Sequence, residues 1–110
     1  MKTREVLFVR IYTTEKKGEK ERFLKLLHDR EKVCGVTVYR AISGFGKSGH
    51  LHHADLLDLS LDLPIVIEFF DEREKAERIL ADLEALVEPG HMVSWPARVH
   101  FPPEEDPPVS

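Results

Sequence analysis

Hydrophobic and polar residues alternate with two different periods along this chain. From Val6 to Tyr12 apolar side chains occupy every second position, which is the pattern of a β-strand with one buried face: Leu7, Val9 and Ile11. From Glu19 to Lys32 the period becomes helical, because apolar positions recur three and four residues apart between charged ones: Phe23, Leu26, Leu27, Arg30 and Val33. This pattern predicts an amphipathic helix, and Gly35 is a fitting stop after it.

The same two periods return in the second half of the chain. Alternating or continuously apolar runs predict strands over Val36 to Ile42, Leu63 to Phe70 and Met92 to Phe101. Between the last two, Asp71 is a candidate helix N-cap with Glu74 completing a capping box. The helix is expected to end at Pro89-Gly90, and its inward stripe is Ala76, Ile79, Leu80, Leu83 and Leu86.

This order of elements is β-α-β-β-α-β, which is typical of the ferredoxin-like α+β fold. It predicts a four-stranded antiparallel sheet with two helices on one face and a long loop between strands two and three. The third strand is apolar on both alternate sets, so the face opposite the helices is expected to be covered by another subunit. The folded domain is expected to span residues 4–101, followed by a flexible proline-rich tail over 102–110.

Composition narrows the class of protein. A chain of 110 residues forms one domain, and its formal net charge of −4 argues against a nucleic-acid binder. The single cysteine, Cys34, excludes an internal disulfide and fits a reducing compartment. No apolar run approaches the ~20 residues of a membrane span. We therefore expect a cytoplasmic protein that is not inserted in a membrane.

The connection between the second and third strands carries the candidate chemistry. It begins with a glycine-rich segment whose backbone N–H groups could bind an anion, with a lysine adding positive charge: Gly44, Phe45, Gly46, Lys47, Ser48 and Gly49. The spacing matches G-x-G-x-x-G, but a dinucleotide site needs that motif to open a helix, and the next firm element here is a strand. A P-loop fails because Ala41 stands where its first glycine is required. A merely flexible turn is the alternative.

Three histidines follow, at His50, His52 and His53, and imidazole is a common metal ligand. No cysteine is near them and Asp55 is the only close carboxylate, so no metal site is assigned and these histidines remain an alternative. No nucleophile, base and acid stand in a recognisable catalytic context, so we do not expect an enzyme. Gly90 and His91 are further binding candidates, with a helix C-cap as the alternative interpretation.

Two blocks of sequence resemble a known family. G-V-T-V-Y-R-A-I-S-G-F-G-K-S-G-H (35–50) is similar to the second strand and T-loop start of PII signal-transduction proteins. With D-L-P-I-V-I-E-F downstream, the chain looks closer still to the PII-like family called domain of unknown function 190. The resemblance covers roughly Leu7 to Val99. It implies a homotrimer with inward-facing sheets that binds adenine nucleotides between subunits, through Gly44 to Gly49 and Pro89-Gly90-His91.

The resemblance has one departure that matters. Glu88-Pro89-Gly90-His91 stands where PII proteins carry a G-D-G-K-type phosphate loop, so AMP, ADP, ATP or another anion are all open as ligands. The favoured hypothesis is a trimeric PII-like signalling protein whose long loop acts on a partner such as a membrane transporter or channel. The alternatives are a metal-binding trimer, resembling copper-tolerance proteins, and a protein–protein adaptor that binds no small ligand.

Overall fold

The computed structural model describes residues 1–14, 18–33, 35–41, 43–44, 52–53 and 63–103. The expected tail lies mostly outside these residues, as does Cys34. The elements in chain order are β1 (Lys2–Thr14), α1 (Glu19–Lys25), the π-helix η2 (Leu26–Arg30), β2 (Val36–Arg40), β3 (Ser43–Gly44), β4 (His52–His53), β5 (Pro64–Asp71), α2 (Arg73–Leu83) and β6 (Met92–Phe101). The predicted β-α-β-β-α-β order is confirmed, and the β3–β4 ribbon is inserted in the long connection.

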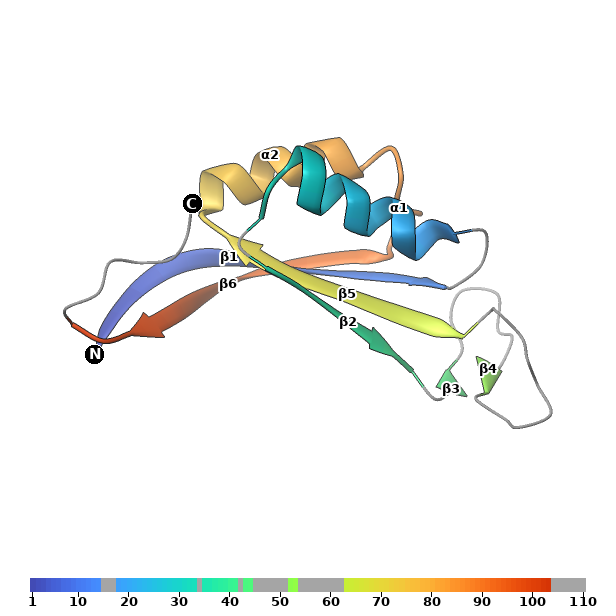
Figure 1. The fold of residues 1–110 in the computed structure, drawn as a ribbon, viewed down its shortest axis with the longest axis horizontal. Helices are drawn as coiled ribbons and strands as arrows, with labels where there is room; N and C mark the ends of the chain where they lie inside the picture. Colours follow the sequence, from blue (N-terminus) through green and yellow to red (C-terminus); the bar gives the residue numbers. More distant parts are fainter. Residues whose placement is uncertain (15–17, 34, 42, 45–51, 54–62, 104–110) are drawn as a thin grey trace.

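The fold is built on a four-stranded antiparallel sheet with the strand order β2-β5-β1-β6. β1 lies at its centre and pairs with β5 from Leu7 opposite Asp71 to Thr14 opposite Pro64. On its other side, β1 pairs with β6 from Lys2 opposite Phe101 to Ile11 opposite Met92. Both helices cover the same face of this sheet (Figure 1). The predicted ferredoxin-like architecture is therefore confirmed.

The hydrophobic core lies between the helices and that face. Because side chains alternate across a strand, β1 and β5 contribute every second residue to it, with Val9 opposite Phe69 and Ile11 opposite Ile67. The buried core cluster is Val9, Ile11, Phe23, Leu27, Ile65, Ile67, Phe69, Ile79 and Leu83. The alternating apolar positions predicted from the sequence, such as Val9 and Ile11, are therefore the ones buried in the core.

The first helix is shorter than predicted. It ends at Arg30 with a π-helical turn, in which the Glu31 backbone N–H donates to the Leu26 carbonyl at 3.0 Å. Lys32, not Gly35, adopts the left-handed conformation after it, with φ 53°. The Lys32 carbonyl accepts a hydrogen bond from Lys75 Nζ at 2.9 Å. This contact with α2 stabilises the backbone conformation after the first helix. Arg30 is exposed and does not belong to the inward stripe.

The predicted N-cap of the second helix is wrong. Asp71 is the last residue of β5, and its side chain is fully buried. Its Oδ1 accepts a hydrogen bond from the Glu72 backbone N–H at 2.8 Å, and its Oδ2 lies 3.1 Å from Lys75 Nζ. Glu72 occupies the N-cap position and makes no side-chain capping bond, so Asp71 and Glu74 form no capping box.

The end of the second helix also differs from the prediction. α2 ends at Leu83, well before Pro89-Gly90, and turns follow it. Leu86 is 40% exposed and therefore lies outside the inward stripe. The chain thus has a connection of several residues between α2 and β6.

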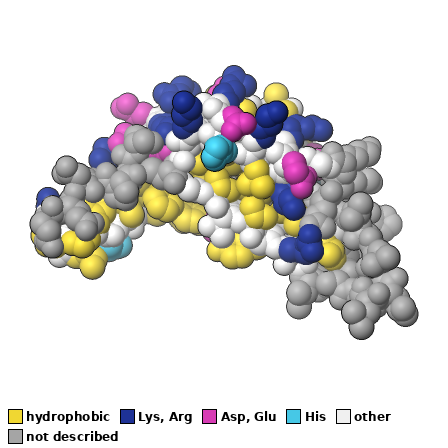
Figure 2. All heavy atoms as spheres, in the orientation of Figure 1, with side chains coloured by type: hydrophobic (Ala, Val, Ile, Leu, Met, Phe, Trp, Pro, Cys, Tyr) yellow, Lys and Arg dark blue, Asp and Glu magenta, His cyan; other side chains and the backbone are white. Residues whose placement is uncertain are grey.

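The face of the sheet away from the helices has no cover within the described residues. Phe8 stacks on Trp95 with ring centroids 4.8 Å apart and on Phe70 at 6.1 Å. Arg10 lies over the Trp95 ring at 5.1 Å and its Nη2 is 2.8 Å from Glu68 Oε1. We call this surface the open face; the strand register assigns to it Phe8, Arg10, Tyr12, Tyr39, Val66, Glu68, Phe70, Val93 and Trp95. In Figure 2 hydrophobic side chains gather along the lower margin of the molecule, below the helices.

Within the described residues, no helix is both long enough and apolar enough to cross a membrane.

A carboxyl pair lies at the junction of the two helices. The Glu31 side chain is only 7% exposed, and its buried Oε2 has no hydrogen-bond partner among the described residues. Burial raises the pKa of Glu31, and so do the hydrogen bond and negative charge of Asp82 on α2, while Arg30 and Arg78 oppose the shift. Two ionised carboxylates have no proton to share, so this hydrogen bond forms only when one of them is protonated.

Replacing Glu31 with glutamine is expected to stabilise the protein at pH 7 by about 1–3 kcal/mol, because the amide can donate to Asp82 without a proton from solvent. Since the folded-state pKa of Glu31 is raised, the stability it contributes is complete below its unfolded pKa and is lost as pH rises through the folded pKa. We expect the free energies of unfolding of the native protein and of Glu31→Gln, measured with urea between pH 4 and 8, to diverge as the pH rises.

The matched control is Glu77→Gln, which changes an exposed glutamate of α2 that pairs only with Arg73 at 3.1 Å in the described residues. It should leave the pH dependence of stability unchanged. If the free energy of unfolding changes equally with pH in the native protein and in Glu31→Gln, Glu31 and Asp82 share no proton.

Candidate functional site

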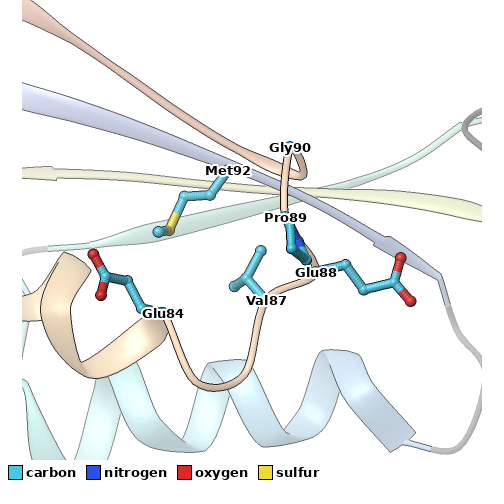
Figure 3. Close-up of a pocket in the computed structure, with 6 residues that line it drawn as sticks. All are labelled: Glu84, Val87, Glu88, Pro89, Gly90 and Met92. Carbon is cyan, nitrogen blue, oxygen red and sulfur yellow. The ribbon is translucent and has the colours of Figure 1, made fainter.

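A cavity of about 280 Å³ lies in the connection between α2 and β6. Its lining residues are Glu84, Val87, Glu88, Pro89, Gly90 and Met92. Figure 3 shows Val87 and Met92 between the end of the helix and the strand, with the Glu84 and Glu88 side chains extending away from Val87 in opposite directions. The lining therefore combines apolar side chains with two glutamates.

The backbone of this connection is fixed by three features. Gly90 has φ 84°, a left-handed conformation that favours glycine. The His91 N–H donates to the Glu88 carbonyl at 3.0 Å, and the His91 carbonyl accepts from the Tyr12 N–H at 2.8 Å. Gly90 and His91 are therefore part of a turn tied to the end of β1, and the alternative interpretation of them as the C-cap of α2 is wrong.

Of the glycine-rich segment, only the first residue, Gly44, is described. Gly44 belongs to β3 and pairs with His52 of β4, and Ser43 pairs with His53. The other candidates of this segment lie outside the described residues: Phe45, Gly46, Lys47, Ser48, Gly49 and His50. Among the residues that are described, no three His, Cys, Asp or Glu side chains gather in a way that could hold a metal ion.

The two candidate stretches lie at the same end of the sheet but at opposite edges. β2 ends at Arg40, opposite Ile65, and the Ala41 N–H then donates to the Pro64 carbonyl at 2.8 Å. β6 begins at Met92, opposite Ile11 of β1. Since β5 and β1 lie between these edges, three strand spacings of about 4.8 Å, roughly 14 Å in all, separate them. One subunit therefore does not bring Gly90-His91 and the base of the long loop together.

The sequence pointed to Pro89 and Gly90 of the lining and to His91 beside it, but Glu84, Val87 and Met92 were not predicted as lining residues. The helical pattern was extended to Pro89, which placed Glu84 and Val87 on the helix. Met92 was predicted only as the start of a strand. A prediction that the helix ends at Leu83 would have revealed the connection. The buried apolar stripe of the helix does not continue to Leu86, which is exposed.

Comparison with known proteins identifies the family. Residues 6–99 match domain of unknown function 190, whose description is "Uncharacterized ACR". The chain belongs to this family. A UPF0166 protein of Aquifex aeolicus is 39% identical over 80 residues, which cover 69% of this chain and 76% of that protein.

Solved structures agree with the fold. CPII from Thiomonas intermedia, described as a nitrogen regulatory PII-like protein bound to ADP, AMP and bicarbonate, matches with a TM-score of 0.67 at 23% identity, over 89% of each chain. The divalent ion tolerance protein CutA1 from Ehrlichia chaffeensis matches with a TM-score of 0.58 at 7% identity, over 90% of this chain and 85% of the other. At these identities the likeness shows a shared fold.

Proposed function

We propose that this protein is a PII-like regulator that binds an adenine nucleotide between the subunits of a homotrimer. The observation that carries the proposal is the division of the candidate site between opposite edges of the sheet. The cavity beside Gly90 lies at the β6 edge, and the glycine-rich loop leaves from the β2 edge. A complete site would form where the β6 edge of one copy meets the β2 edge of the next.

The open face supports assembly from several copies. It presents Tyr12 at 43%, Tyr39 at 51% and Val93 at 45% exposure beside the stacked Phe8, Phe70 and Trp95 rings. Aromatic side chains supply much of the burial energy of interfaces. Three copies with their open faces turned inward would cover this surface.

The proposed mode of action is regulation without chemistry. Ligand binding at the base of the connection between β2 and β5 would set the conformation of this segment, which would then dock on a partner protein such as a membrane transporter or channel. CPII, which shares the fold, was crystallised with ADP and AMP. The proposed compartment is the cytoplasm, where these nucleotides occur.

Calorimetric titration with AMP, ADP and ATP tests the proposal, using native protein and Lys47→Ala. A charge-assisted hydrogen bond contributes about 1.5–3 kcal/mol, so loss of the Lys47 ammonium is expected to weaken nucleotide binding roughly tenfold to a hundredfold. Lys25→Ala, which removes an exposed lysine of α1, should leave affinity unchanged. Equal affinities for native protein and Lys47→Ala would contradict the phosphate role of the loop.

The same titrations with zinc, copper and nickel test the metal-binding alternative. If metal binds and His50→Ala abolishes that binding while nucleotides give no heat, the metal-binding trimer replaces the proposed regulator. If neither class of ligand binds, the protein–protein adaptor is favoured.

A further inference from the structure

The backbone between the first helix and β2 adopts two unfavourable conformations in succession. In the π-helical turn η2 the Glu31 N–H donates to the Leu26 carbonyl, and the Val33 N–H then donates to the Leu27 carbonyl at 3.2 Å. Lys32 follows with φ 53°, a left-handed conformation that is unfavourable for a residue with a Cβ atom. Single π-helical turns are rare and often lie at functional sites. Such a backbone persists only where surrounding contacts hold it.

A buried carboxyl group makes one of these contacts. The Glu31 side chain is 7% exposed and is hydrogen-bonded to the carboxyl group of Asp82 on α2. Its buried Oε2 has no hydrogen-bond partner in the described part of the chain, although Arg30 Nε lies 4.0 Å from it. Arg78 of α2 adds a second positive charge, and Lys75 binds the backbone carbonyl of the next residue. Two carboxyl groups and two guanidinium groups therefore meet where the end of η2 faces α2.

The protonation state of the two carboxyl groups decides whether this contact is favourable. When they hold one proton between them, one group donates to the other. When both are ionised, no donor remains, and two negative charges face each other in a partly buried site where repulsion is stronger than in water. Burial and the neighbouring Asp82 raise the pKa of Glu31, so its proton is lost closer to neutral pH than that of an exposed glutamate.

The π-helical turn provides an alternative conformation for the ionised state. It contains one residue more than an α-helical turn, so its conversion to α-helix would rotate the following residue by about 100° around the helix axis. This rotation would move Glu31 away from Asp82 and break the hydrogen bond of the Val33 N–H. We infer that Glu31 and Asp82 form a proton-operated latch, which holds η2 in its π-helical form against α2 while the pair shares a proton and releases it when both groups are ionised.

The latch joins the two elements that precede the candidate stretches. η2 leads into β2 and from there into the glycine-rich connection. Asp82 is the last residue but one of α2, ahead of the connection to β6. A change in pH would therefore alter how these two elements are held together. The inference does not depend on ligand binding, so its test uses the protein alone.

The test measures amide hydrogen exchange by NMR between pH 4 and 8. The Val33 amide reports on the latch, because its hydrogen bond to Leu27 belongs to the closed conformation. Four proteins are compared, namely native, Glu31→Gln, Asp82→Asn and Glu77→Gln. Each of the two pair variants places an amide donor in the pair, so both should keep the latch closed at every pH. Glu77→Gln removes the same charge from an exposed position of α2.

In native protein and in Glu77→Gln the protection factor of Val33, which is corrected for the intrinsic pH dependence of exchange, is expected to fall about tenfold as the pH rises. The fall should have the midpoint at which the ¹³C resonance of the Glu31 carboxyl group shows loss of its proton in these two proteins. In Glu31→Gln and Asp82→Asn the protection factor should change less than about twofold.

The inference is overturned if Val33 protection in native protein does not fall through that midpoint. It is also overturned if the fall persists in Glu31→Gln or in Asp82→Asn, since the proton that matters would then belong to another group. The same spectra show whether each variant is folded, and should one pair variant fail to fold, the other decides.

Discussion

Replacing Asp71 with alanine is expected to lower the free energy of unfolding by about 3–5 kcal/mol, the usual cost of removing one partner of a buried ion pair. The Asp71 side chain is fully buried at the end of β5, and Lys75, 15% exposed, lies 3.1 Å from its Oδ2. Alanine would remove the carboxylate that faces this ammonium. It would also remove the acceptor of the Glu72 N–H, which is bound at 2.8 Å.

Urea unfolding at fixed protein concentration measures the change, with an unchanged m-value as the sign that the folded state is retained. Asp29→Ala is the matched control, because the Asp29 carboxylate is 57% exposed and contacts only the neighbouring His28 among the described residues. It should cost less than about 0.5 kcal/mol. The double variant Asp71→Leu with Lys75→Met should recover most of the loss. A cost below about 1 kcal/mol for Asp71→Ala would show that the pair is not buried.

Asp71 also shows why some local predictions failed. Asp followed three residues later by Glu is the sequence of a capping box, and nothing local distinguishes it from the last residue of a strand. The pairing of Asp71 with Leu7 decides the outcome, since it extends β5 by one residue. Similarly, Lys32 rather than Gly35 adopts the left-handed conformation after the first helix. The Lys75 side chain, 43 positions away in sequence, contacts the Lys32 carbonyl.

The fold itself could be predicted because it depends on periodicity over whole elements. Met92–Phe101 was predicted with its observed limits. The alternating positions Val9 and Ile11 lie fully buried in the core. Burial of one face of a strand or helix is repeated over many residues, so an error at one position does not change the result.

The candidate site could be predicted only in part. Gly90 lines the cavity and His91 lies next to it, but Glu84, Val87 and Met92 depend on where α2 ends. The position of the two candidate stretches at opposite edges was available from the sequence, because the ferredoxin-like strand order places β2 and β6 at the edges. The inference that two copies share one site follows from this order.

Replacing Val93 with lysine is expected to dissociate the proposed homotrimer, with the midpoint of assembly shifted at least about 100-fold in concentration. Val93 lies on the open face, opposite Arg10 of β1, and is 45% exposed in the single chain. The isolated subunit should therefore tolerate the change. In a trimer all three copies would bury an unpaired charge beside Arg10, whose own partner is Glu68.

Ser94→Lys is the matched control, because adjacent residues of a strand point to opposite faces. Ser94 is exposed and lies opposite Val9, on the side of the sheet that carries the helices. Light scattering at micromolar concentration should give three times the 12.7 kDa chain mass for native protein and Ser94→Lys, and one chain mass for Val93→Lys. A native monomer would contradict the homotrimer, and equal dissociation of both variants would contradict its assembly through the open face. Because the proposed site needs two sheet edges from different copies, Val93→Lys should lose nucleotide affinity together with assembly, although Val93 is no part of the cavity lining.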